Sequence, residues 1–283
     1  MRDDPTVTAA GAGAGSGAAP AGRDDTHEYT LANSWEHARR RLELVQQVHD
    51  AATVRRLTGL GVGPGWRCLV PGAGGGSVAR WLGERVGPGG HVLATDVDTR
   101  LLDEAPDRPS SVEVRRHDIT RDPLPAGAFD LVQVRLLLVH LPEREQVLQR
   151  LAASLRPGGW LLAEEYDVFP TQTSPHESYA AYWRAVAEVV ARAGADFAWG
   201  RQLPGALARV GLGAVRADCD VHVFAGGSPA AEAHHLSALQ LRARLLASGL
   251  LPAAVFDEVQ RRLADRERWM LGPAMVAAWG QRG

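Results

Sequence analysis

The chain has 283 residues, of which 45% are hydrophobic and 23% charged, an ordinary composition for a soluble globular protein. Its 31 basic and 33 acidic residues leave a formal net charge of −2, so we expect neither nucleic acid nor an anionic membrane as a partner. The two cysteines, Cys68 and Cys219, are too few for a disulfide framework or a cysteine-based metal site. The sequence has no apolar run of about 18 residues and no secretory leader, so we expect a cytoplasmic protein.

The chain begins with an alanine- and glycine-rich stretch, residues 1–26. It can bury too little apolar surface to offset the entropy cost of ordering, so we expect a disordered tail. We expect residues 27–283 to form a single domain. Apolar residues at helical spacing predict a helix from about residue 30 to residue 60, with Asn33 or Ser34 as its cap.

Short apolar segments then alternate with helical ones. The expected strands lie at residues 67–71, 91–96, 112–117, 128–136 and 160–164. The expected helices between them lie at residues 77–86, 101–105 and 144–155, the last closed by a turn at 156–159. This alternation predicts a parallel sheet covered by helices on both faces.

The remainder is mainly helical. Helices are expected at residues 176–193, 203–210, 230–248 and 253–265, and strands at 214–224 and 275–279. Helices inserted between late strands occupy the place where an α/β fold usually carries its substrate cover.

The most informative segment is LVPGAGGGS, residues 69–77, between the first strand and the following helix. Its glycines let the backbone turn sharply and approach a ligand closely. The helix that follows offers free N–H groups to a polar or anionic ligand group. Asp96 ends the second strand, where an acid accepts hydrogen bonds from ribose hydroxyls; the alternative is a turn or capping role. Asp98 is interpreted as the cap of the next helix.

Five segments in order resemble the motifs of class I S-adenosylmethionine-dependent methyltransferases, in the small-molecule branch common in actinobacterial secondary metabolism. They are GAGGGS at 72–77, ATDVD at 94–98, RRHDI at 115–119, AFDLVQVRLLLVHLPER at 128–144 and RPGGWLLAEEYD at 156–167. The resemblance implies a Rossmann-like α/β fold with a seven-stranded sheet whose last strand is antiparallel. It also implies a helical lid at 27–62, a cofactor-binding core at 63–167, and cover helices and last strands at 168–283.

The same resemblance implies site residues for S-adenosylmethionine, which leaves as S-adenosylhomocysteine. They are Tyr29, Arg40, Gly72, Ala73, Gly74, Asp96, Val97, Asp118, Ile119 and Arg135. Asp118 and Ile119 would hold the adenine. Arg135 would lie by the sulfonium mainly through its backbone, with its side chain turned away or paired with a carboxylate.

One position departs from the family pattern. The family usually carries an acid two residues before the first motif glycine, where it holds the ammonium of the cofactor; this chain has Val70. The change leaves open a substitute from the N-terminal helix. It also leaves open a repurposed enzyme that binds the cofactor without consuming it and promotes a cyclisation or rearrangement.

His140 is the candidate general base, because an imidazole titrates near neutrality; the alternative is a structural histidine. The candidate substrate-pocket residues are Trp35, Glu165, Asp167, His176, Tyr179 and Trp183, with core packing or solvated acids as the alternative. His234 and His235 lack further ligands at metal spacing, so no metal is expected.

The sequence therefore predicts a methyltransferase that acts on a small, fairly apolar metabolite in natural-product or antibiotic biosynthesis. We expect a monomer or a homodimer, without nucleic acid or membrane partners. Besides the repurposed enzyme, a non-catalytic binding module that partners another methyltransferase stays open.

Overall fold

The computed structural model describes residues 35–105 and 107–283. The described strands form a seven-stranded sheet with the order β3-β2-β1-β4-β5-β7-β6. The strands are β1 (Arg67–Pro71), β2 (His91–Asp96), β3 (Val112–Arg116), β4 (Phe129–Arg135), β5 (Leu155–Asp167), β6 (Leu212–Ala225) and β7 (Trp269–Arg282). β7 runs antiparallel to both β5 and β6, whereas the other pairs are parallel, which confirms the expected sheet.

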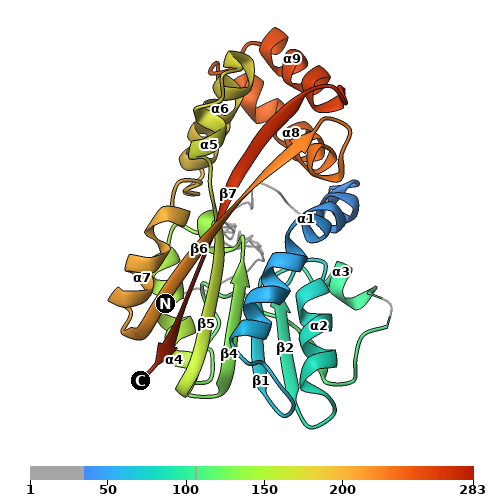
Figure 1. Cartoon of the computed structure of the whole chain (residues 1–283). Coiled ribbons are helices and arrows are strands. Elements are labelled where there is room, and N and C mark those ends of the chain that lie inside the picture. The colour runs from blue at the N-terminus through green and yellow to red at the C-terminus, as the bar shows by residue number, and fades with distance from the viewer. Residues whose placement is uncertain (1–34, 106) are drawn as a thin grey trace, which may run out of the picture.

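Helices cover both faces of this sheet, as Figure 1 shows. The α-helices are α1 (Ala38–Gly59), α2 (Ser77–Val86), α3 (Arg100–Asp103), α4 (Arg144–Ser154), α5 (Phe169–Gln172), α6 (Glu177–Arg192), α7 (Leu203–Arg209), α8 (Pro229–Ala247) and α9 (Ala253–Ala264). Two 3-10 turns, η1 (Leu138–His140) and η2 (Gly200–Gln202), complete the described elements. Within the described part of the chain, no helix is long and apolar enough to span a membrane.

The first half of the fold follows the sequence pattern closely. The bounds of β1, α2 and β2 equal the expected ones, because buried parallel strands read as short apolar runs between glycine turns. The expected strands at 160–164 and 275–279 are only parts of the longer β5 and β7. Residues 156–159, assigned to a turn from the sequence, belong to β5, where Gly158 adopts φ +78°. α5 is not predicted, and the possible caps Asn33 and Ser34 lie outside the described residues.

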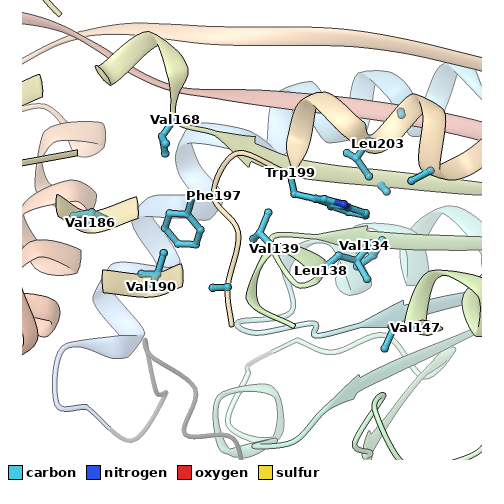
Figure 2. Packing of buried hydrophobic residues seen from close by; sticks show 14 of the residues in the cluster. Val134, Leu138, Val139, Val147, Val168, Val186, Val190, Phe197, Trp199 and Leu203 are labelled. Carbon is cyan, nitrogen blue, oxygen red and sulfur yellow. The ribbon is translucent and has the colours of Figure 1, made fainter. Parts of the chain in front are cut away.

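The late helices share a hydrophobic core with the sheet. Figure 2 shows Val186 and Val190 of α6 close to Phe197, in the same cluster as Val134 of β4 and Val147 of α4. In Figure 1, α5, α6, α8 and α9 gather around the extended ends of β6 and β7. The cover helices are therefore anchored by apolar packing beyond the carboxyl ends of the central strands.

Helix α1 is held on the sheet by polar contacts. Three of its residues, His49, Thr53 and Arg56, are spaced four and three apart, so they share one face of the helix. This face contacts Glu164 and Tyr166, which are two residues apart in β5 and therefore lie on the same side of the strand.

The Arg56 guanidinium is the centre of this attachment. Its Nη1 donates to Glu164 Oε1 over 2.8 Å, and its Nε donates to Asp218 Oδ1 over 2.8 Å. It also pairs with Asp220, the second carboxylate from β6. The side chains of Arg56 and Glu164 are only 3% and 0% exposed. We call Arg56, Glu164, Asp218 and Asp220 the α1 clamp.

Because Arg56 and Glu164 are buried, removing the cation leaves the Glu164 carboxylate without its charged partner in the interior. Arg56→Met is expected to lower the free energy of unfolding by about 3–5 kcal/mol, measured by urea denaturation. Arg55, one residue earlier, is 61% exposed and also pairs with Asp220. Arg55→Met should cost less than about 1 kcal/mol, and equal losses in the two variants would contradict the clamp.

Candidate active site

A cavity of about 830 Å³ opens beyond the carboxyl ends of β1, β2, β4 and β5. Ligands of open α/β sheets bind at this edge. One end of the cavity is lined by the glycine turn and the loops after β2 and β3. The other end, which we call the chamber, is lined by side chains of α1, α6, α8, β5 and β6.

The glycine turn is shaped for close approach. Gly72, Gly74 and Gly76 adopt φ values of +62°, +55° and +78°, in the left-handed region that favours glycine. A Cβ atom at Gly72 would lie 3.0 Å from Leu137 Cδ1, and one at Gly75 would lie 2.3 Å from Gln46 Nε2. The glycines therefore let α1 and the loop after β4 lie directly over the turn.

Asp96 lies beside this turn and is 9% exposed. Its Oδ2 accepts a hydrogen bond from the Gly74 N–H over 3.0 Å, and its Oδ1 accepts one from the Asp98 N–H over 3.1 Å. Burial raises the pKa of Asp96, against the effect of these two N–H groups. A carboxylate oxygen can accept more than one hydrogen bond, so both oxygens can still accept from a pair of hydroxyls.

The loop after β3 completes the adenosine end of the cavity. Asp118 is oriented by Thr120, whose backbone N–H donates to Asp118 Oδ1 over 2.9 Å. Ile119, 6% exposed, and Val97, 52% exposed, also line the cavity. With Ala73, the cavity brings together all the expected cofactor residues from the glycine turn and the three strand ends. Together with the glycine cradle, these groups fit an adenosyl ligand.

Arg135 lines the cavity at the end of β4. Its Nη2 donates to Asp50 Oδ1 and its Nη1 to Thr53 Oγ1, both over 2.8 Å. The guanidinium is thus paired with a carboxylate, as expected for a cation near a sulfonium site.

Val70 is 4% exposed and also lines the cavity. The carboxylates among the described lining residues are Asp96, Asp98, Asp118, Asp122 and Glu143. None of these lies on β1 or α1, so no acid in the described lining takes the place that Val70 leaves. The α1 side chain over the turn is the amide Gln46.

Arg40 and Tyr29 are the two residues of the lid that were expected to contact the cofactor. The prediction for Arg40 is wrong in position: its guanidinium turns to the surface and binds both carboxylate oxygens of Glu232 over 2.8 Å. Arg41, 5% exposed, lines the cavity instead. One residue along a helix rotates the side chain by about 100°, which accounts for the difference. Tyr29 lies outside the described residues.

Only Trp183 of the expected substrate-pocket residues lines the cavity. Tyr179 is turned away, with its hydroxyl donating to the Leu271 carbonyl over 3.0 Å, and Tyr182 takes its place in the wall. Trp35 packs against the apolar cluster around Leu44, and His176 is the N-cap residue of α6; neither lines the cavity.

The acids expected near the substrate are separated by the alternation of β5. Glu165 is fully buried and accepts hydrogen bonds from the N–H groups of η1, 2.8 Å from Leu138 N. Asp167 is fully buried and pairs with Arg201. Neither carboxylate lines the cavity, because both point away from the side of β5 that carries Glu164 and Tyr166. They hold the segments that contain η1 and η2 in place.

His140 does line the cavity, with its ring edge-on to Phe197 at a centroid distance of 5.4 Å. Burial, with Arg41 and Arg144 nearby, lowers the pKa of His140 to about 3. The ring is therefore neutral near pH 7.

Several other polar residues of the chamber were not predicted from the sequence to line it. They are His49, Tyr166, His222 and His234. His49 Nε2 and Tyr166 Oη share a hydrogen bond of 2.9 Å. His222 comes from β6 and His234 from α8, so only the tertiary fold brings them to α1. The spacing of His49, Thr53 and Arg56 was visible in the sequence, but their partners were not.

The buried histidines predict loss of stability in acid. Burial lowers the pKa of His234 to about 4 and that of His140 to about 3, below their ordinary value of 6.5. The unfolded chain therefore binds more protons as the pH falls below about 6.5, so stability present above that pH is lost toward pH 4. His234→Phe should reduce the slope of unfolding free energy against pH by up to about 1.4 kcal/mol per unit. Urea denaturation between pH 4 and 7 measures this, and parallel curves for the two proteins would contradict it.

Known proteins resemble this chain in sequence over part of its length, and others resemble it in fold. Residues 69–163 match a family model described as a methyltransferase domain. The chain is 34% identical over 127 residues to the ubiquinone/menaquinone biosynthesis C-methyltransferase UbiE of Laribacter hongkongensis, covering 42% of this chain and 50% of that protein. The chain thus spans about half the length of this curated relative.

Solved structures show the same fold. The YcgJ protein of Bacillus subtilis has a TM-score of 0.55 at 13% identity, covering 83% of this chain and 100% of that one. The (4+2) cyclase SpnF has a TM-score of 0.51 at 19% identity, covering 84% and 83%. Residues 69–163 therefore resemble a methyltransferase domain in sequence, and the described chain has the fold of these solved structures.

Proposed function

We propose that this protein transfers the methyl group of S-adenosylmethionine to a small, fairly apolar metabolite of natural-product biosynthesis. The observation that carries the proposal is the shared cavity: the glycine turn and Asp96 open into the chamber walled by Trp183, Phe197 and Phe224. The relative UbiE is named for C-methylation in quinone biosynthesis, which supports a small-molecule acceptor.

The residues of this chain would divide the work of binding. Asp96 would hold the ribose hydroxyls, Asp118 and Ile119 the base, and the glycine turn the methionine part. When bound, S-adenosylmethionine supplies a methyl group on a sulfonium, open to attack by a nucleophile. The protein contributes mainly by aligning the acceptor and excluding water. Pairing of Arg135 with Asp50 reduces its repulsion of a sulfonium.

The second candidate is a cyclisation or rearrangement in which the cofactor is bound and not consumed. Val70 favours it, because the described cavity lining offers no carboxylate from β1 or α1 for the cofactor ammonium. The similarity to the cyclase SpnF concerns the fold alone. The cytoplasmic location and the monomeric or dimeric state stay predictions.

The two candidates differ in whether S-adenosylhomocysteine is released. The protein is incubated with S-adenosylmethionine and a panel of phenols, enols, amines and carbon acids, and both products are quantified by mass spectrometry. Methyl transfer predicts S-adenosylhomocysteine in a one-to-one ratio with a methylated acceptor. An acceptor that is converted without S-adenosylhomocysteine would favour the second candidate and contradict the first.

A further inference from the structure

The chamber contains a hydrogen-bonded pair that the proposed function leaves without a role. His49 Nε2 lies 2.9 Å from Tyr166 Oη, and the two rings meet edge-on at a centroid distance of 5.6 Å. Both residues line the cavity, and His49 is only 4% exposed. Burial, with Arg135 and His222 nearby, lowers the pKa of His49 well below its ordinary value, so its imidazole is neutral at rest and gives up an added proton readily. A tyrosine hydroxyl backed by a neutral imidazole can receive one proton while it passes on its own.

The fold fixes this pair from two directions. His49 is two turns before Arg56 on the same face of α1, so the α1 clamp sets its position. Tyr166 is two residues after Glu164 on the same side of β5, so the clamp carboxylate sets its position too. Hydroxyl and imidazole are therefore held together by the most buried ion pair that α1 makes with the sheet.

The charges around the pair favour an anion. Burial raises the pKa of Tyr166 to about 12, while Arg135 and Arg41 act in the opposite direction. The carboxylates in the described cavity lining come from the end of β2, from the loops after β2 and β3, and from Glu143 beyond η1. An amine acceptor would become a cation near Arg41 and near the ion pair of Arg135 with Asp50. A hydroxyl acceptor that develops negative charge would be stabilised there.

The walls of the chamber match an aromatic or polyene-like acceptor. Trp183 and Phe224 contact His234 at ring-centroid distances of 5.5 and 5.2 Å, and His222 lies 5.2 Å from His49. The Nε2 atom of His222 is enclosed and has no hydrogen-bond partner among the described residues. It offers a polar contact to a second oxygen of the acceptor.

From this geometry we infer that Tyr166 is the catalytic proton acceptor, that His49 positions it, and that the acceptor is a phenolic or enolic hydroxyl. The inference rests on the proposed function. The hydroxyl proton passes to Tyr166 Oη as the Tyr166 proton passes to His49 Nε2. The acceptor oxygen forms its bond to the methyl carbon, whose bond to sulfur breaks with the electron pair going to sulfur. The products are the methyl ether and S-adenosylhomocysteine, and His49 then releases its proton to water.

The test compares two phenols of different acidity in Tyr166→Phe and His49→Phe, which keep the rings. One phenol is as weakly acidic as tyrosine, with a pKa of about 10; the other is 4-nitrophenol, assayed at a pH at which it is ionised. With the weak acid, kcat should fall by about 10²–10⁴-fold in Tyr166→Phe, because proton transfer is lost. With the ionised phenol it should fall at most a few-fold. His49→Phe should show the same contrast with a smaller loss.

Tyr179→Phe is the matched control, since the Tyr179 hydroxyl binds the Leu271 carbonyl outside the cavity. Tyr179→Phe should change kcat by the same factor with both phenols. Absorbance of 4-nitrophenol bound to the protein loaded with S-adenosylhomocysteine gives a readout independent of turnover. We expect a larger phenolate fraction in the wild type than in Tyr166→Phe at the same pH.

Equal losses with both phenols would reduce Tyr166 to a structural residue and overturn the inference. Turnover of amines or carbon acids but not of phenols by the wild type would overturn the acceptor class while leaving methyl transfer intact. Binding of S-adenosylmethionine without S-adenosylhomocysteine release from any acceptor would instead overturn the proposed function.

Discussion

The buried guanidinium of Arg56 fixes where α1 lies, and the cavity depends on that position. Its contacts reach Glu164 on β5 and both carboxylates on β6, so one side chain joins the helix to two strands of the sheet. A buried ion pair contributes little net stability but fixes geometry, because misplacing either partner leaves a charge unpaired in the interior. With α1 fixed, Gln46 covers the glycine turn, and Arg41 and His49 face the cavity.

The two ends of the cavity are built in different ways. The adenosine end is local: glycine turn, strand-end acid and loop acid each follow directly from a strand of the parallel sheet. The chamber is tertiary, since its wall combines α1, α6, α8, β5 and β6. Binding of the adenosine part can therefore stay constant while the cover helices, and hence the acceptor, change. The polar pair of His49 and Tyr166 lies in the chamber, where α1 contacts β5.

This division also explains what the sequence could predict. Asp96 and Asp118 could be predicted to line the cavity, because each lies at or just beyond the carboxyl end of a parallel strand, where the cavity opens. Arg40 was predicted in place of Arg41 because a helix pattern leaves the rotation of α1 uncertain by one residue, or about 100°. The β5 acids were grouped together, although alternation places Glu165 on the other side from Glu164. His222 and His234 could not be assigned to the cavity from the sequence, because no local pattern relates β6 and α8 to α1.

The central claim is that the cavity binds S-adenosylmethionine through the turn and Asp96. Calorimetric titration of the wild type, Asp96→Ala and the control Asp103→Ala, an exposed residue of α3, tests it most directly. We predict saturable binding by the wild type and the control. In Asp96→Ala it should weaken by about ten- to a hundredfold, the equivalent of about 1.5–3 kcal/mol for hydrogen bonds to a charged group. Absence of binding by the wild type, or unchanged affinity in Asp96→Ala, would contradict the account.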